Sequence, residues 1–499
     1  MRGRRGRRWS SVLGIETTAV YRWGGPIQLR ARSGHTQDPA WKRVPSFAGG
    51  DARRQAVPSS LPPPRATMPR RITILVLALA LSVAPVLVAQ GLPAGHPAQL
   101  EFSPQRLARI DTLIQSYVDE GRSPGVVAMI LRRGTVAWSG AFGMADRESK
   151  QPMTADALFR IASQTKAVTS VAAMILVEEG RLRLGDPVSR FIPSFADARV
   201  AVATDSGRTL VPLAHRITIR DLLTQTAGLS YGTGSLIRDD YRAAGLGPAA
   251  GYGWYLADKN EPVCATMDRL GTLPLAAQPE EVWIYGYASD VLGCVVERAA
   301  GMPLDQFFQE RIFAPLQMHD SWFFPPDSAG HRLTAVYSVT TEGTLVRAPV
   351  GPLGQGDYLA GPRLNFAGGA GLVSTAGDYA RFLQMLLNGG ELDGARILSP
   401  ATVSLMTVNQ VGALYSQPGF GFGLGFQILE DPGLAGDYGS VGRFGWGGAY
   451  ATNYWVDPTE ELVVVLMQQL LPSRGLDLAG TFRTMVYAAL IPPARTQGY

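Results

Sequence analysis

Two apolar patterns near the start of the folded region predict a helix followed by a hairpin. Segment 103–121 opens with Ser103-Pro104, a helix start signal, and then carries apolar residues at every third or fourth position. Two short apolar runs follow, 126–131 and 135–140, with an Arg-Gly turn signal between them. We therefore expect one helix next to a pair of antiparallel strands.

The C-terminal part of the chain also contains strand-like runs and one helix. Strand-like apolar runs occupy Phe420–Leu429, Arg443–Trp446, Ala451–Val456 and Leu462–Gln468. A last apolar helix is expected to begin at a capping residue, Asp477, and to extend to Ile491.

These patterns predict an α/β (α+β) architecture. Strands from both chain ends are expected to form one antiparallel sheet, flanked by the first and last helices. The stretch between them, about 177–361, is mostly helical and loop-rich, so we expect it to form an inserted, mainly helical lobe. A cleft between the lobe and the sheet is the expected place for a site.

Composition fits a globular protein, but the charge is unevenly placed. The 499 residues are 46% hydrophobic and 17% charged. Residues 1–67 hold 13 Lys and Arg against 3 Asp and Glu, which leaves 33 basic and 38 acidic residues in the remainder. The net charge of +5 therefore comes from the leader. Because the remainder is slightly acidic, no nucleic-acid partner is expected.

The first 89 residues have the character of processing segments. Residues 1–67 lack apolar periodicity and form a basic leader, either disordered or absent from the natural product. Met68 is a better candidate for the initiator methionine. Two arginines and the apolar run 72–89 follow it, as in a secretory signal. Cleavage after Ala89 is favoured over a retained membrane anchor. The remaining domain, 90–499, is then exported to the periplasm or secreted, with no stable membrane anchor.

Cysteine and histidine positions give no indication of a metal site. Only Cys264 and Cys294 are present, so a disulfide between them and two buried free thiols both remain open. The five histidines are scattered, and no Cys/His cluster has metal-ligand spacing. We expect no metal and no other cofactor.

The strongest candidate chemistry is the motif Ser163-x-x-Lys166. A helix is expected to begin at or near Ser163, and a spacing of three places Lys166 one turn further along the same face. Burial disfavours the charged form of a lysine, which prepares it to accept a proton at neutral pH. The backbone N–H of Ser163 would point at the group that its hydroxyl attacks. Taken alone, the motif also fits a capping serine beside a solvated lysine.

The surrounding sequence adds a family resemblance. Phe-Arg-Ile-Ala-Ser-Gln-Thr-Lys at 159–166, with Val-Glu-Glu-Gly-Arg-Leu-Arg-Leu-Gly-Asp-Pro-Val at 177–188, resembles the serine β-lactamase and penicillin-binding-protein superfamily. Other landmarks lie at 217–229, 369–379 and 386–390. The resemblance covers about 103–490, is closest to class C β-lactamases and family VIII carboxylesterases, and implies a β-lactamase/transpeptidase-like fold.

The resemblance also implies a catalytic tyrosine. Trp283-Ile-Tyr-Gly-Tyr287 places Tyr285 at that position. A phenolate beside a lysine ammonium is a credible general base, and the phenol can later protonate the leaving group. Tyr287 stands where β-lactamases carry an asparagine that holds the substrate amide, so efficient β-lactam recognition is not expected. Gln225 stands where the family usually has histidine, and no role follows for it.

A third motif departs from the penicillin-recognising pattern. Gly445-Trp-Gly-Gly-Ala449 replaces Lys-Thr-Gly and is similar to the family VIII esterases. Trp446 offers apolar surface and one N–H donor where those enzymes have a cation, while Gly447 and Gly448 let the backbone approach a substrate. The resemblance implies that the N–H groups of Ser163 and Ala449 form an oxyanion hole.

Together these residues predict acyl transfer through a serine ester. Lys166 and Tyr285 remove the Ser163 proton, and water later releases the acid. Trp446 and Tyr287 favour neutral or hydrophobic esters, so we expect a carboxylesterase, compatible with weak β-lactamase activity, whose partner is a small-molecule ester or β-lactam-like substrate. The alternatives are a β-lactamase or D-alanyl-D-alanine carboxypeptidase, an acyltransferase, and a penicillin-binding sensor without turnover. Arg443 either adds affinity for anions or is a solvated strand residue.

Overall fold

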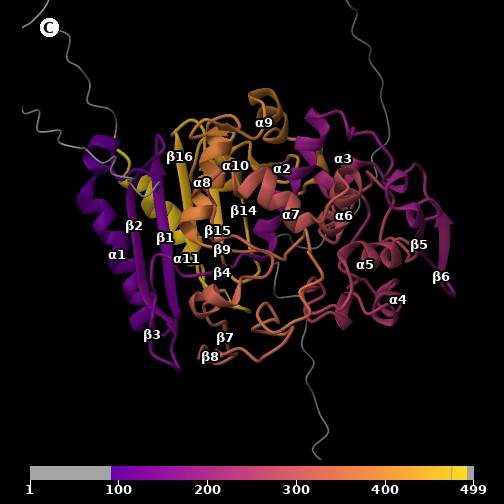
Figure 1. Ribbon diagram of the computed structural model, residues 1–499, viewed down its shortest axis with the longest axis horizontal. Coiled ribbons are helices and arrows are strands. Elements are labelled where there is room, and N and C mark those ends of the chain that lie inside the picture. Colours follow the sequence, from indigo (N-terminus) through magenta and orange to yellow (C-terminus); the bar gives the residue numbers. More distant parts are fainter. Residues whose placement is uncertain (1–90, 474, 492–499) are drawn as a thin grey trace, which may run out of the picture. The chain divides into compact units, whose positions relative to one another are not determined.

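The computed structural model describes residues 91–473 and 475–491 (Figure 1). The basic leader and the signal peptide predicted from the sequence lie outside these residues. Within the described ranges, no helix combines the length and the apolar character that crossing a bilayer requires.

One antiparallel sheet organises the fold. Among the described residues it has eight strands, in the order β12-β13-β14-β15-β16-β1-β2-β3. Their bounds are β1 Gly125–Arg132, β2 Thr135–Asp146, β3 Gln151–Pro152, β12 Phe420–Phe422, β13 Gln427–Leu429, β14 Phe444–Gly447, β15 Asn453–Asp457 and β16 Leu462–Met467. The N-terminal strand β1 pairs with the C-terminal strand β16, with Val127 opposite Met467. The prediction of one sheet built from both chain ends is confirmed.

Helices cover both faces of this sheet (Figure 1). The first and last helices, α1 (Pro104–Asp119) and α11 (Leu478–Ala489), pack on one face, and α2 (Thr165–Glu178) and α8 (Ala376–Leu387) pack on the other. Alternate residues of β16 divide between the two cores: Val464 joins α1 and α11, whereas Val463 joins α2 and α8. A strand buried on both faces is continuously apolar, as β16 is.

The predicted caps of the flanking helices are confirmed. The Ser103 hydroxyl accepts the N–H of Arg106 at 3.3 Å, and the Asp477 carboxylate accepts the N–H of Gly480 at 2.8 Å. Each bond satisfies a backbone donor that has no partner within its own helix.

The single strand predicted for 420–429 is wrong. The segment forms a hairpin, in which β12 and β13 pair with Phe422 opposite Gln427. The turn between them contains Gly425 at φ +99°, a conformation that side chains disfavour. The turn contains no polar residue that would separate two apolar runs, and only its glycines indicate it. The sequence pattern therefore indicates one strand where the structure has two.

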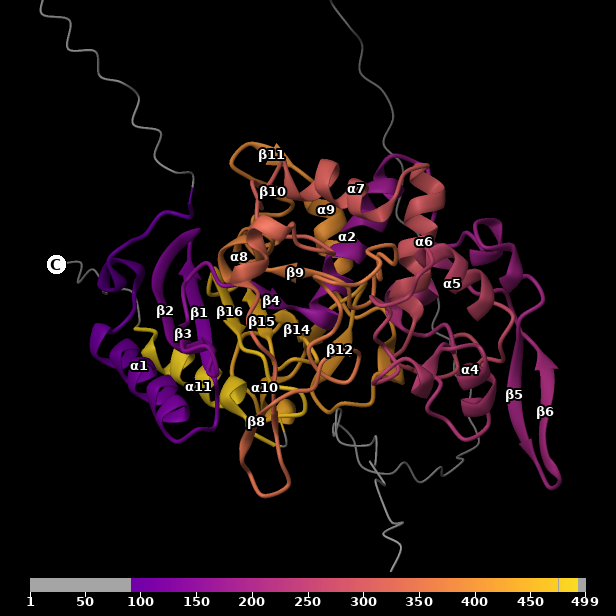
Figure 2. The ribbon, with the colours of Figure 1, turned by 60° about the horizontal axis from the view of Figure 1, so that its bottom comes forward.

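The central stretch contains mostly helices. They are α3 Ile219–Thr224, α4 Arg238–Ala243, α5 Val263–Leu270, α6 Ala288–Ala300 and α7 Leu304–Phe308, continued by a π-helical turn, Gln309–Phe313. Two hairpins accompany them, β5 (Arg199–Thr204) with β6 (Gly207–Pro212), and β7 (Tyr337–Val339) with β8 (Leu345–Arg347). Figure 2 shows the β5–β6 hairpin beside α4, away from the main sheet. Cys264 and Cys294 form a disulfide that joins α5 to α6, which decides between the two alternatives left by the sequence.

Short elements complete the fold around the sheet. They are β4 Phe159–Arg160 paired with β9 Val373–Ser374, β10 Glu391–Leu392 paired with β11 Ala395–Arg396, and the helices α9 Pro400–Met406 and α10 Pro432–Ala435. The β4–β9 pair matters most for the site, because the chain turns from β4 directly into the segment that carries Ser163.

Candidate active site

Ser163 lies in a tight 3₁₀ turn, Ala162–Gln164, that joins β4 to α2. The residue before it, Ala162, takes a φ of +42°, a strained value for a residue with a side chain. The surroundings hold this turn in place, since the Gln164 carbonyl accepts the hydroxyl of Tyr379 at 2.9 Å. Ser163 itself is only 5% exposed. The helix start predicted at or near Ser163 is confirmed, with α2 proper beginning at Thr165.

Lys166 is a buried hub of hydrogen bonds. Its Nζ donates to Ser163 Oγ at 3.3 Å, to the Tyr231 hydroxyl at 3.0 Å and to the carbonyl of Gly369 at 2.7 Å. An ammonium has three N–H donors, so these three acceptors match its full capacity. The alternative of a solvated lysine is therefore wrong, and the structure brings Lys166 and Ser163 together as predicted.

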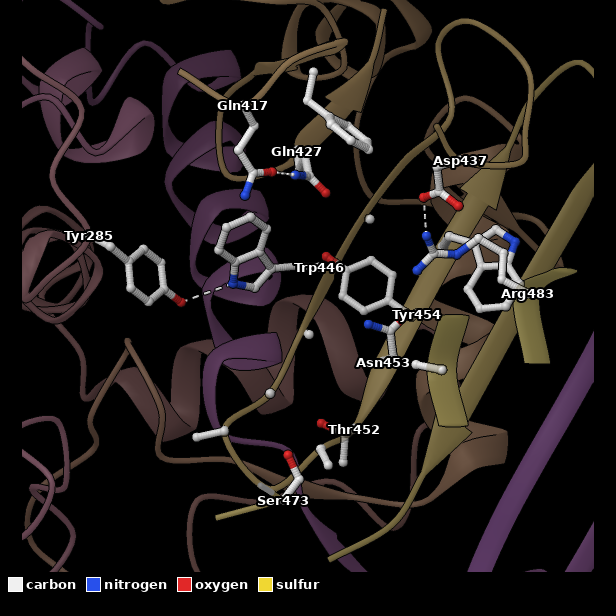
Figure 3. Close-up of a pocket in the computed structure, with 18 of the residues that line it drawn as sticks. Tyr285, Gln417, Gln427, Asp437, Trp446, Thr452, Asn453, Tyr454, Ser473 and Arg483 are labelled. Carbon is white, nitrogen blue, oxygen red and sulfur yellow. Dashed lines mark hydrogen bonds and ion pairs between the residues drawn. The ribbon is translucent and has the colours of Figure 1, made fainter. Parts of the chain in front are cut away.

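Tyr285 completes the cluster from a distant part of the chain. The Lys166 Nζ lies 4.6 Å from the centroid of its ring. On the other side, the indole N–H of Trp446 donates to the Tyr285 hydroxyl at 2.9 Å, and Figure 3 shows these two side chains facing each other. Four predicted residues, Ser163, Lys166, Tyr285 and Trp446, therefore lie in one place.

Gln225, for which the sequence suggested no role, holds the Tyr285 loop. Its backbone carbonyl accepts the N–H of Ile284 at 2.9 Å, and its side-chain Oε1 accepts the N–H of Gly286 at 3.3 Å. Its amide also donates to Ser289 Oγ at 3.1 Å. These bonds therefore hold the backbone on both sides of Tyr285.

Sequence reasoning missed Tyr231. It comes from the loop after α3, 65 positions from Lys166, and no local pattern marks it. Its ring stands edge-on to the rings of Tyr285 and Tyr287, with centroids 5.8 and 5.0 Å away. The site therefore presents two phenols to Lys166, not one.

We expected Tyr287 to be a substrate-binding residue, but the structure buries it outside the cavity lining. The side chain is fully buried, its hydroxyl donates to the carbonyl of Gly253, and it accepts the N–H of Gly247 at 2.9 Å. Burial raises the pKa of this phenol well above its usual value. Tyr287 supports the ring of Tyr231 from behind and does not reach the cavity.

The end of β14 runs directly against the turn that carries Ser163. A Cβ at Gly448 would lie 2.3 Å from the carbonyl oxygen of Ile161 and 2.2 Å from Thr452 Oγ1. Only glycine fits so close an approach. This contact brings Ala449, the next residue, to the side of the site. That its N–H pairs with that of Ser163 as an oxyanion hole stays a prediction.

We expect Gly448→Ala to lower kcat for ester hydrolysis about a hundredfold, because the added methyl pushes the strand end and its N–H donor away from the site. Steady-state kinetics check this value. Gly185→Ala is the matched control, since a Cβ there meets no atom within 4 Å. Activity of Gly448→Ala within threefold of the wild type would contradict the proposed close approach.

A cavity of about 560 Å³ opens beside Tyr285 and Trp446. Its lining includes Trp283, Tyr415 and the backbone of 447–449, but not Ser163, so it is a recess next to the point of attack. Aromatic rings form one wall: the Trp283 ring lies 4.8 Å from that of Tyr415. Figure 3 shows Gln417 and Gln427 hydrogen-bonded to each other above Trp446, and further polar residues, among them Asn453 and Arg483, line the rest of the cavity.

Arg443 is not a solvated strand residue. It lies one position before β14, is 5% exposed, and pairs with the Asp437 carboxylate at 2.9 Å. Arg483 binds the same carboxylate. Two guanidinium groups therefore share one carboxylate, and Arg443 is held in place by this contact.

Comparison with known proteins identifies the family. The family model described as Beta-lactamase matches residues 110–485. Esterase EstB from Burkholderia gladioli is 34% identical over 380 residues, which cover 72% of this chain and 89% of that protein. Lovastatin esterase from Penicillium rubens is 33% identical over 410 residues, covering 76% and 98%. Among solved structures, "EstCE1, a hydrolase with promiscuous acyltransferase activity" has a TM-score of 0.66 at 31% identity and covers 78% of this chain and 99% of its own.

The matched range includes the main sheet from β1 to β16 and the whole cluster around Ser163. The relatives named above are described as esterases or as a hydrolase. Their matches to this chain cover 89%, 98% and 99% of their own lengths. The chain therefore belongs to the β-lactamase family, and it is a serine hydrolase of that family.

Proposed function

We propose that the protein is a carboxylesterase that acts on neutral or hydrophobic esters through an acyl-enzyme on Ser163. The observation that carries the proposal is the position of Trp446. Its indole N–H binds the Tyr285 hydroxyl, so an apolar ring stands where penicillin-recognising relatives present a lysine.

In the first half of the proposed reaction, Ser163 Oγ attacks the ester carbonyl. The hydroxyl proton passes to the Tyr285 phenolate, which the nearby Lys166 ammonium stabilises. The carbonyl oxygen becomes an oxyanion, which the N–H groups of Ser163 and Ala449 receive. Collapse of this intermediate breaks the ester C–O bond, and the leaving alcohol takes its proton from Tyr285.

In the second half, water replaces the alcohol. Its proton passes to the Tyr285 phenolate while its oxygen attacks the acyl carbon. The Ser163 oxygen then leaves, takes the proton back from Tyr285, and the carboxylic acid is released. Tyr285 lines the cavity, so both the alcohol and the water have a route to the same phenol.

The aromatic wall supports the choice of substrate. The ring of Tyr285 lies 5.8 Å from the Trp283 ring and 5.4 Å from the Trp446 ring, centroid to centroid, so three aromatic residues of the lining stand next to one another. Such a wall stabilises apolar groups and provides no charge for a substrate carboxylate. Two arginines of the cavity lining, Arg443 and Arg483, both bind the Asp437 carboxylate.

We expect 4-nitrophenyl esters to be hydrolysed with a kcat/KM about a hundredfold or more above that of a chromogenic cephalosporin, because the aromatic wall binds apolar chains and both arginines of the cavity lining are engaged with Asp437. A series from acetate to octanoate, measured in the same buffer, tests this expectation, and Ser163→Ala gives the background rate. A cephalosporin turned over faster than every ester would reject the esterase in favour of a β-lactamase.

A second candidate is acyl transfer to an alcohol. EstCE1 is described as having promiscuous acyltransferase activity, and an acyl-enzyme beside an apolar wall can receive an alcohol in place of water. Butyl ester formed from 4-nitrophenyl butyrate in the presence of butanol, detected by gas chromatography, would support this reaction.

A further inference from the structure

A buried carboxylate that the proposed reaction does not use lies behind Lys166. Asp290, in the first turn of α6, is 1% exposed. Its Oδ1 accepts the backbone N–H of Gly369 at 2.9 Å, and the carbonyl of Gly369 accepts the Lys166 Nζ at 2.7 Å. A single residue therefore connects the carboxylate to the lysine.

We propose that Asp290 is a positioning residue for the proposed reaction: it anchors the Gly369 carbonyl that receives Lys166, and its negative charge keeps Lys166 in the ammonium form. An ammonium stabilises the Tyr285 phenolate and cannot itself take the Ser163 proton, so Asp290 assigns the role of proton acceptor to Tyr285. This inference rests on the proposed function and deepens it.

The packing around Gly369 supports a dedicated contact. A Cβ at this position would lie 2.4 Å from Asp290 Oδ2, so a side chain here would displace the carboxylate. The preceding residue, Gly368, is gripped as well, because its carbonyl accepts the hydroxyl of Thr169 on α2 at 2.7 Å. The segment is thus clamped between α2 and α6.

The charge of Asp290 depends on pH. Burial raises the pKa of this carboxyl to about 6, against the opposing effect of the Lys166 charge. Asp290 is therefore ionised above about pH 6 and neutral below it. Its titratable neighbour on the same turn is Tyr287, whose pKa is raised mainly by burial and also by the Asp290 charge. Asp221 on the neighbouring helix α3 is engaged with Thr218 at 2.8 Å.

Asp290→Asn separates charge from contact. The amide oxygen can still accept the Gly369 N–H, but the negative charge is lost. We expect kcat to fall about tenfold at pH 8 with KM within about threefold, because the change acts on proton transfer and not on binding. Both limbs of the pH profile of kcat/KM are expected to move about one unit toward lower pH, since Lys166 and Tyr285 release protons more easily without a nearby anion.

Gly369→Ala tests the contact with the charge retained. Its methyl group meets the Asp290 carboxylate, which displaces the carbonyl that receives Lys166. We expect kcat to fall about a hundredfold because Lys166 is misplaced. The two limbs of the pH profile of kcat/KM should keep their wild-type positions. An unchanged kcat in Gly369→Ala would overturn the anchoring role of Asp290. This test remains decisive even if Asp290→Asn does not fold.

Asp378→Asn is the matched control. Asp378, on α8, is also a buried carboxyl whose pKa burial raises to about 6, and it accepts the Asp320 N–H at 2.7 Å and the Ser321 hydroxyl at 3.0 Å. It has no link to Lys166 through Gly369. We expect its profile to match that of the wild type. Equal limb shifts in Asp378→Asn and Asp290→Asn, or no shift in Asp290→Asn, would overturn the charge role.

The rate of labelling by a fluorophosphonate, measured against pH, gives a readout that needs no ester. If the wild type hydrolyses no ester but reacts with the probe at Ser163, the proposed carboxylesterase is rejected and the labelling profile still decides the role of Asp290. A wild type that reacts with neither would overturn both proposals.

Discussion

Ser163→Ala is expected to remove ester hydrolysis almost completely, with kcat lower by about 10⁴-fold or more, because no other group can form the acyl ester. The fold should survive the change. Ser163 Oγ receives one hydrogen bond, from Lys166 at 3.3 Å, and Lys166 keeps its bonds to Tyr231 and Gly369. We therefore expect the free energy of unfolding to change by about 1 kcal/mol or less.

Hydrolysis of 4-nitrophenyl butyrate and the mass of the intact protein after fluorophosphonate treatment check this prediction together. Ser170→Ala is the control, because Ser170 is a buried serine on α2, seven positions further along the chain. It should keep wild-type activity and gain the mass of the probe. Labelling of Ser163→Ala at another residue, or activity above a tenth of the wild type, would show that Ser163 is not the nucleophile.

The sheet was predictable because its signals are local. The apolar runs of β1, β2 and β16 and the caps Ser103 and Asp477 depend on neighbours a few positions away. The bounds of β1 and β16 were predicted within one residue, whereas β2 extends six residues beyond its predicted end at Gly140. The β12–β13 hairpin was missed for the same reason, since its turn interrupts an apolar run without a polar residue. The pairing of β1 with β16 has no local signal. We predicted it from the general tendency of strands and helices to pack in layers around one core.

The residues of the site also differ in whether a sequence signal indicates them. Ser163 and Lys166 are one helical turn apart, so their spacing allowed a contact that the family resemblance then favoured. Tyr285 and Trp446 were found through motifs that resemble a family. Tyr231 carried no sequence mark, and the landmarks that contain Gln225 and Gly369 did not reveal their contacts, because these contacts join loops far apart in sequence. Their roles arise only when the chain is folded.

The two phenols around Lys166 give the second large prediction. The Tyr231 hydroxyl accepts a hydrogen bond from Lys166 Nζ at 3.0 Å, and the same Nζ lies 4.6 Å from the centroid of the Tyr285 ring. Contact with the lysine would favour Tyr231 as the proton carrier. The route of the leaving group favours Tyr285, because Tyr285 lines the cavity and Tyr231 does not. A leaving alkoxide must be protonated where it departs, so we expect Tyr285 to transfer the proton.

Tyr285→Phe is accordingly expected to lower kcat about a thousandfold, since proton transfer in both half-reactions is lost, while Tyr231→Phe lowers it about tenfold by removing one acceptor of Lys166. The two variants are matched, because each deletes one hydroxyl from a ring that packs against the other. The loss in Tyr285→Phe should shrink for 4-nitrophenyl esters relative to alkyl esters of the same acid, since 4-nitrophenolate leaves without a proton. A larger loss in Tyr231→Phe, or equal losses for both kinds of ester, would transfer the acid–base role away from Tyr285.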